Sequence, residues 1–185
     1  MIFRETRLKG AYIVDIERRE DERGFFARTW CQREFEAHGL NPRLAQCSIS
    51  FNAKKGTLRG MHYQVKPFEE AKLVRCTRGS LCDIIVDLRW DSPTFKDHLG
   101  VTLTSDNRAM FYIPEGFAHG FLTLEDETEV QYQISEFYAP DHARGFRWND
   151  PAFGIVWPSD IMVISDRDRN YPDFCGQEWL SRCVL

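Results

Sequence analysis

The chain has 185 residues, of which 43% are hydrophobic, and it carries 24 Lys and Arg against 28 Asp and Glu, a formal net charge of −4. This charge balance provides no general basic field for nucleic acid or an anionic membrane surface. No apolar run approaches the ~20 residues that span a bilayer, so the sequence predicts a soluble protein without nucleic-acid or membrane partners.

Turn-forming residues divide the chain into short segments. These turn signals occur at 23–24, 55–56, 78–79, 91–93, 105–107, 114–116 and 139–141. The stretches between them are rich in Val, Ile, Leu, Phe and Tyr and have the length of β-strands. Many short strands at such spacing are typical of a β-sandwich or barrel, so we predict an all-β fold.

Helical patterns are scarce. Residues 31–38 have the pattern of two helical turns around Phe35, and residues 177–183 have the pattern of a short C-terminal helix. The sequence contains no linker, low-complexity tract or internal repeat. We therefore expect one domain, residues 1–185, with a few short helices.

Two predicted strands show informative alternation. In 81–88, Asp83 and Asp87 share a face with apolar residues, which predicts a lined cavity or an interface on that face rather than plain solvent. In 128–134, Tyr132 alternates with Gln and Glu and shares its face with Val130 and Ile134. Tyr132 should therefore point inward.

The six cysteines do not form a recognisable motif. They are Cys31, Cys47, Cys76, Cys82, Cys175 and Cys183. None are in a CxxC pair, and no secretory leader precedes them. Reduced thiols in a cytoplasmic protein are the expectation.

Residues 114–119, Pro-Glu-Gly-Phe-Ala-His, match the second signature of the cupin barrel, in which the histidine faces inward. A metal-binding cupin also carries a His-x-His pair and a downstream Glu, because a metal needs three or four convergent ligands. Here the corresponding positions are His62, Gln64 and Lys72. Gln is a poor ligand and an ammonium group cannot be one, so we predict a site with no metal and no cofactor.

The remaining polar residues suit the removal of a proton next to a carbonyl group. A histidine titrates near neutral pH and can act as base, a tyrosine can act as acid, and a lysine can stabilise an enolate. A single inward His or Tyr is more often structural. Their combination with a barrel signature that lacks metal ligands favours a proton-transfer enzyme. Nearby basic residues, Arg23, Arg59, Lys72 and Arg75, would hold a diphosphate, although about half of them also fit ordinary surface ion pairs.

Eight segments together resemble the dTDP-4-dehydrorhamnose 3,5-epimerase family. They are DERGFF (21–26), TLRGMHYQ (57–64), KLVRC (72–76), SPTF (92–95), IPEGFAHGF (113–121), WNDP (148–151), GIVWP (154–158) and ISDRD (164–168). The resemblance runs from about residue 10 to residue 170. It implies a cupin-type jelly roll that forms a homodimer, and an enzyme that inverts the stereocentres beside the ketone of a nucleotide-linked 4-keto-6-deoxyhexose.

The resemblance also implies roles for individual residues. His62 would be the base with Asp168 as its paired carboxylate, Tyr132 the acid on the opposite face of the sugar, and Lys72 the group that stabilises the enolate. The implied substrate-binding residues are Arg23, Phe26, Gln46, Ser48, Arg59, His119, Tyr138 and Arg167. Among them, Arg23 and Arg59 would hold the diphosphate, and Tyr138 would stack on the thymine ring.

The chain departs from the family pattern at Arg28, Ser48 and Arg144, where the family commonly has Glu, Asn and Glu. These positions resemble nucleotide and phosphate contacts, so the sugar and the base are less well defined than the chemistry. The sequence leaves four alternatives open: an epimerase acting at carbon 3 only, an epimerase of another 4-keto sugar nucleotide, a metal cupin such as a dioxygenase or isomerase, and a non-catalytic sugar-nucleotide-binding module.

Overall fold

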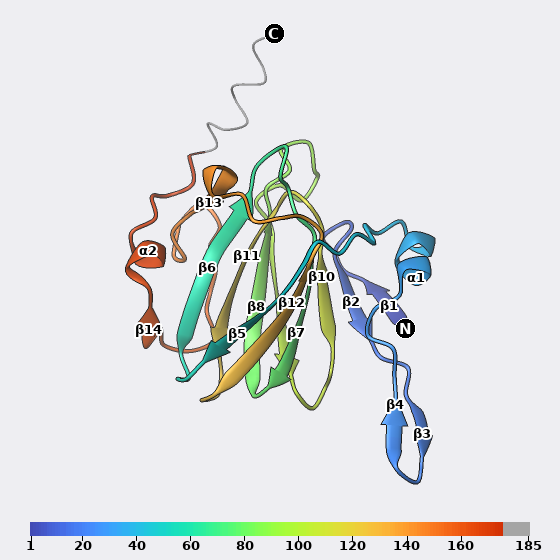
Figure 1. The fold of residues 1–185 in the computed structure, drawn as a ribbon. Helices are drawn as coiled ribbons and strands as arrows, with labels where there is room; N and C mark the ends of the chain where they lie inside the picture. Colours follow the sequence, from blue (N-terminus) through green and yellow to red (C-terminus); the bar gives the residue numbers. More distant parts are fainter. Residues whose placement is uncertain (176–185) are drawn as a thin grey trace.

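The computed structural model describes residues 1–175 (Figure 1). Two antiparallel sheets face each other, which confirms the predicted all-β class. The first sheet has the order β1 (Ile2–Glu5), β2 (Tyr12–Asp15), β10 (Met110–Ile113), β7 (Lys72–Arg78), β12 (Thr128–Ile134) and β5 (Gln46–Asn52). The second has the order β13 (Ala143–Gly145), β6 (Thr57–Gln64), β11 (Phe117–Thr123), β8 (Ser80–Asp87) and β9 (His98–Thr104), and β14 (Val163–Ile164) pairs in parallel with β6.

The helices are short, as predicted. Helix α1 (Gln32–Ala37) begins directly after Cys31 and buries Phe35, which confirms the helix expected over 31–38. A 3₁₀ turn η1 (Pro140–His142) and α2 (Asp166–Arg169) follow later in the chain. The helix expected at 177–183 lies outside the described residues. Within residues 1–175, no helix has the length and apolar character needed to span a membrane.

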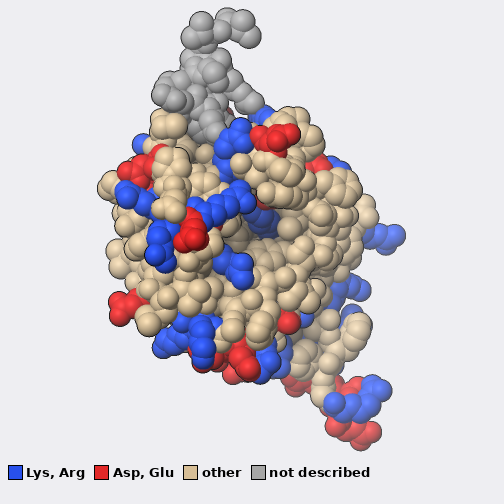
Figure 2. Space-filling model, turned by 60° about the vertical axis from the view of Figure 1, so that its left-hand side comes forward, with Lys and Arg blue, Asp and Glu red and all other residues tan. Residues whose placement is uncertain are grey.

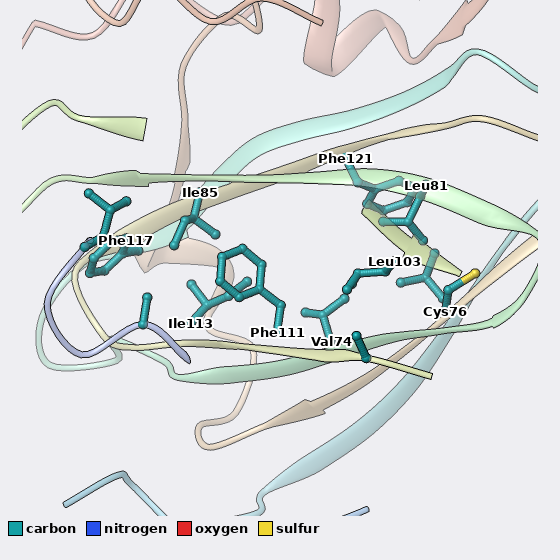
Figure 3. Close-up of a cluster of buried hydrophobic side chains, with 13 residues drawn as sticks. Val74, Cys76, Leu81, Ile85, Leu103, Phe111, Ile113, Phe117 and Phe121 are labelled. Carbon is teal, nitrogen blue, oxygen red and sulfur yellow. The ribbon is translucent and has the colours of Figure 1, made fainter. Parts of the chain in front are cut away.

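Apolar side chains fill one part of the space between the sheets (Figure 3). Val74 and Phe111 of the first sheet face Ile85 and Phe121 of the second sheet in this cluster. Alternation explains the arrangement, because every second residue of each strand points between the sheets. The core leaves the region between β5, β12 and β6 for polar side chains, and the candidate site lies there.

Strand β8 is buried on both faces, which the alternation in 81–88 does not reveal by itself. Its inner face packs in the central core. Its outer face packs against Met61 and against Phe146, which directly follows β13. Asp83 and Asp87 are both fully buried. Asp87 accepts hydrogen bonds from Arg89 and from the hydroxyls of the following turn, so it holds a turn, and only Asp83 reaches the cavity region.

A two-stranded hairpin of β3 (Arg19–Asp21) and β4 (Gly24–Phe26) extends away from the two sheets like an arm (Figure 1). Its residues are exposed, and the Phe26 side chain is 72% exposed. The guanidinium groups of Arg18 and Arg108 lie over the ring of Phe25, at 5.0 and 5.1 Å from its centre. A hollow of about 510 Å³ lies between this arm and the outer face of the first sheet.

Gly60 occupies a position where a side chain does not fit. Its φ of +134° lies in the region that favours glycine, and an added Cβ would lie 2.5 Å from the Cα of Gly120 on β11. We expect Gly60→Ala to lower the free energy of unfolding by about 2–4 kcal/mol, because backbone must move to make room. Urea denaturation measures the change. Gly100→Ala is the control, since its Cβ would make only ordinary contacts at 3.6 Å, and an equal loss in both variants would contradict this explanation.

Candidate active site

A cavity of about 330 Å³ opens between the two sheets. Figure 2 shows a hollow on this side of the molecule, with Lys and Arg side chains within it and around its rim. The cavity is lined by Ser48, Ile49, Ser50, Arg59, His62, Lys72, His119, Phe121, Tyr132, Ile134 and Asp168. All four residues predicted to be catalytic are therefore brought together.

His62 and Asp168 form a close pair although they are 106 residues apart in sequence. The Nε2 of His62 lies 2.7 Å from Oδ1 of Asp168, whose other oxygen accepts a hydrogen bond from the Gly60 N–H. Strand β14 runs parallel to the start of β6 and thereby brings α2 beside His62. Ser165 caps α2 by accepting a hydrogen bond from the Asp168 N–H. Because Nε2 faces the carboxylate, the Nδ1 nitrogen is left to accept a proton.

The surroundings of Asp168 keep its carboxylate ionised. Burial is the largest effect and by itself raises the pKa, but the hydrogen bond and charge of His62 and the Gly60 N–H outweigh it and hold the pKa of Asp168 below its ordinary value of 3.8. A carboxyl group with a lowered pKa stabilises the fold above the unfolded-state pKa and loses that contribution as the pH falls through the folded-state pKa.

We therefore expect the stability difference between the wild type and Asp168→Asn to persist down to about pH 5 and to shrink as the pH falls below about 4. Urea denaturation of both proteins at a series of pH values measures it. A difference that stayed constant to pH 2 would show that the ionised carboxylate is not what stabilises the pair.

Tyr132 faces the two histidines from the opposite sheet. Its ring lies 6.0 Å from the His119 ring in an edge-to-face arrangement, and His119 is the register partner of His62. Burial raises the pKa of Tyr132 above its ordinary value of 10, and the negative charge of Asp83 raises it further, against a smaller opposite effect of Arg59. Tyr132 therefore keeps its proton at neutral pH, as a proton donor must.

His119 is held by a carboxylate of its own. Its Nε2 lies 3.0 Å from Oδ2 of Asp83, and both side chains are buried. Sequence reasoning did not assign Asp83 to the site, although its position in an apolar strand was a signal. Ser50 and Phe121 also line the cavity, and nothing in the local pattern distinguished them from other inward residues.

Lys72, at the start of β7, is 9% exposed and lines the cavity. Its Nζ lies 2.7 Å from Oε1 of Glu70. This ion pair restricts the rotation of the long Lys72 side chain in the folded protein, so less conformational entropy is lost when a substrate binds. No local pattern in the sequence indicated that Glu70 belongs to this region.

The predicted substrate-binding residues fall into three groups. Ser48, Arg59 and His119 line the cavity itself. Gln46 accepts a hydrogen bond from the Tyr138 N–H at 2.7 Å. Arg167 donates a hydrogen bond to the Tyr171 hydroxyl at 2.7 Å, and its pKa is raised by the nearby Tyr138 and Tyr171. The Tyr138 ring is 55% exposed and available for stacking.

Arg23 and Phe26 form the third group, and they do not lie in this cavity. Both are on the arm, where the Arg23 side chain is 84% exposed and pairs with Asp21. Of the positions that depart from the family pattern, Ser48 lines the cavity, whereas Arg28 pairs with Glu34. Arg144 donates hydrogen bonds to backbone carbonyls of 141 and 143.

The donor set at the signature positions does not suit a metal ion. Gln64 and Lys72 stand where ligands would be needed, and the side chains of both are engaged in other contacts. In residues 1–175, no group of three or more His, Cys, Asp and Glu side chains is arranged to hold a metal.

Comparison with known proteins agrees with the geometry. The family model described as dTDP-4-dehydrorhamnose 3,5-epimerase matches residues 5–175. The enzyme of that name from Methanothermobacter thermautotrophicus is 44% identical over 173 residues, which are 91% of this chain and 92% of the relative.

Solved structures of this kind are also similar. The dTDP-4-dehydrorhamnose 3,5-epimerase from Elizabethkingia anophelis superimposes with a TM-score of 0.91 at 37% identity, over 94% of this chain and 96% of that one. A 3'-monoepimerase from Streptomyces bikiniensis, solved in complex with dTDP-quinovose, gives a TM-score of 0.85 at 31% identity, over 95% of this chain and 89% of that one. The fold is the cupin-type jelly roll, and the chain belongs to the dTDP-4-dehydrorhamnose 3,5-epimerase family.

Proposed function

We propose that the protein is an isomerase, a dTDP-4-dehydro-6-deoxy-D-glucose 3,5-epimerase that forms dTDP-4-dehydro-L-rhamnose. One observation supports this most directly: a histidine held by a carboxylate and a partly buried tyrosine stand on opposite walls of one cavity. Inversion of a carbon centre requires a proton to leave from one face and to return to the other. A base and an acid on opposite sheets meet that requirement.

The proposed reaction begins at Nδ1 of His62, which takes the proton from the carbon next to the ketone. The electron pair of the broken C–H bond moves into a carbon–carbon double bond, and the ketone oxygen becomes an enolate. Asp168 stabilises the imidazolium that forms, and the ammonium of Lys72 stabilises the enolate oxygen. Tyr132 then gives its phenolic proton to the opposite face of the same carbon, and the ketone is restored. Solvent finally takes the proton from His62 and returns one to Tyr132.

The substrate would be held by charged side chains at its diphosphate and by ring stacking at its thymine. Arg59 lines the cavity and offers a planar guanidinium group suited to phosphate oxygens. The exposed ring of Tyr138 would stack on thymine, with Arg167 and Gln46 fixing its segment. Ser48 and His119 would contact the sugar within the cavity.

We propose that the protein acts as a homodimer, in which the arm of one protomer brings Arg23 and Phe26 to the cavity of the other. The arm carries a 72% exposed phenylalanine, and the edge strand β5 exposes Phe51 and Ile49, which also lines the cavity, at 51% and 64%. Exposed apolar side chains of this kind are typical of an interface, and a two-fold axis would bury both sets at once. Sedimentation velocity should give a dimer, and deletion of residues 19–26 should weaken it.

We further propose that the reaction needs no metal or other cofactor and that the chain works as a single domain, residues 1–185, in the cytoplasm. The donor set at the signature positions supports the first part. The five cysteines in the described part of the chain are unpaired, as expected in a reducing compartment.

Proton NMR in heavy water tests the proposed activity. The purified protein is incubated with dTDP-4-keto-6-deoxyglucose and a chelator, and the signals of the protons at carbons 3 and 5 are followed. Loss of both signals with formation of the L-rhamno product supports the 3,5-epimerase. Binding of the ligand without any exchange would contradict the assignment and favour a non-catalytic binding module.

A 3-epimerase, or an epimerase of a different 4-keto sugar nucleotide, is the second candidate. The structural similarity to a 3'-monoepimerase keeps this candidate open, because both kinds of enzyme share this fold. Loss of the carbon 3 signal alone in the same experiment would establish the 3-epimerase.

A further inference from the structure

The ammonium group of Lys72 is tied to a residue outside the catalytic set. Its Nζ and Oε1 of Glu70 are 2.7 Å apart, and the two side chains are only 11% and 12% exposed. The Coulombic attraction within an ion pair so shielded from water is stronger than that within a surface pair. Glu70 does not line the cavity, so the pair has Lys72 on the cavity side and Glu70 behind it.

Gln64 holds the other oxygen of this carboxylate. Its Nε2 lies 3.1 Å from Oε2 of Glu70 and also within hydrogen-bond distance of the carbonyl oxygens of Phe68, at 2.9 Å, and Phe137, at 3.2 Å. Its Oε1 accepts a hydrogen bond from the Ala139 N–H at 2.7 Å. Gln64 is 5% exposed, so these partners replace water for every polar atom of its side chain.

These partners suit an amide and do not suit an acid. Three acceptors surround Nε2 and one donor faces Oε1, which fixes the orientation of the amide. A glutamate at position 64 would place a second negative charge beside Glu70 and would have no proton for the two carbonyl oxygens. The position that holds a metal ligand in a metal cupin is thus used here as a hydrogen-bonding centre.

The same hydrogen bonds connect two parts of the site. The residues on either side of Tyr138, Phe137 and Ala139, both bond to the Gln64 side chain. The chain of contacts therefore runs from the segment of Tyr138 through Gln64 and Glu70 to Lys72. One end lies where the thymine ring would stack, and the other lies where the enolate oxygen would form.

We propose that Glu70 is a positioning residue for Lys72, and that Gln64 joins this ion pair to the segment that carries Tyr138. The proposal rests on the proposed function, since it concerns the same cavity. A lysine side chain has four rotatable bonds. If its ammonium group is already held in place, less conformational entropy is lost when the enolate forms. Because Lys72 lines the cavity, its other N–H groups would serve the enolate oxygen.

Steady-state kinetics of Glu70→Ala measures the positioning role. With dTDP-4-keto-6-deoxyglucose we expect kcat to fall about 10- to 100-fold, because the ammonium remains but is less well placed, while KM stays within about threefold. Glu70→Gln keeps an oxygen acceptor for Nζ and is expected to recover most of the rate. Glu69→Ala is the control: it removes a neighbouring acid whose partner Lys66, at 3.8 Å, does not line the cavity, and its rate should equal that of the wild type.

A double-mutant cycle separates positioning from a general structural effect. In a Lys72→Ala background, Glu70→Ala should produce no further fall in kcat, because there is no ammonium left to position. A second fall as large as that in the wild type would overturn the proposal, as would wild-type kcat in Glu70→Ala.

Gln64→Leu tests the connection to the nucleotide side. We expect a weaker affinity for dTDP, by about tenfold, together with a fall in kcat, whereas Glu70→Ala should leave the affinity for dTDP unchanged. An unchanged affinity in Gln64→Leu would contradict the role of Gln64. Circular dichroism and urea denaturation confirm that the variants compared are folded.

One measurement does not depend on the substrate. The ¹⁵N-edited NMR signal of the Lys72 ammonium should be visible in the wild type, because pairing and burial protect it from exchange with water, and lost in Glu70→Ala. If this signal behaves as expected and the wild type does not turn over the sugar nucleotide, the proposed function fails and the ion pair stands. If turnover is normal and the signal is unaffected by Glu70→Ala, the positioning proposal fails alone.

Discussion

Replacing His62 with alanine is expected to lower the rate of proton exchange at the carbons beside the ketone by about 10²–10⁴-fold, the usual contribution of a positioned general base. Both cavity histidines direct Nε2 to a carboxylate, but the His62 side chain is 41% exposed, whereas that of His119 is 6% exposed and less accessible to a substrate. Exchange is followed by proton NMR in heavy water, and binding of dTDP is measured in parallel by calorimetry.

The matched control is His98→Ala. His98 lies on β9, at the edge of the second sheet and outside the cavity, so its removal should leave exchange unchanged. The affinity for dTDP should stay within about threefold in both variants, because His62 is placed at the sugar end of the site. Full activity of His62→Ala would show that the base has been assigned to the wrong residue.

Tyr132→Phe is expected to separate the two halves of the reaction. The variant retains the ring that packs on His119 and loses only the hydroxyl, so the fold should be preserved. Removal of the proton by His62 should continue, and deuterium should still enter the carbon from the His62 side. Formation of the inverted product should fall about 10²–10⁴-fold, because the proposed acid has lost its proton.

The product of Tyr132→Phe is analysed by NMR for both deuterium content and configuration. Substrate that gains deuterium but keeps its configuration is the expected outcome. Tyr12→Phe, which changes a tyrosine in the cluster on the outer side of the first sheet, is the control and should be fully active. Inverted product at the wild-type rate from Tyr132→Phe would exclude it as the acid.

Local patterns in the sequence were sufficient for the strands and for the direction of several side chains. The alternation in 128–134 predicted both the strand β12 and the inward direction of Tyr132, because side chains of a strand alternate with a period of two whatever the rest of the fold does. The turn signals mark the strand ends for the same reason, since Gly, Pro, Asn and Asp restrict the backbone locally. The pattern in 81–88 predicted less, because a strand that is buried on both faces shows no clear polar side. It did not reveal that Asp83 and Asp87, both fully buried, have different partners.

The sequence by itself determined the all-β class, the strands in 81–88 and 128–134 and, through its family resemblance, the candidate set of His62, Tyr132, Lys72 and Asp168. The tertiary structure alone decided which of them share one cavity, that Glu70 lies behind Lys72, and that Arg23 and Phe26 lie on an arm apart from it. The physical reason is the range of the interactions. The direction of a side chain follows from the nearest residues, whereas its neighbours depend on the pairing of distant strands, such as β14 with β6, which brings a carboxylate to a histidine 106 residues away.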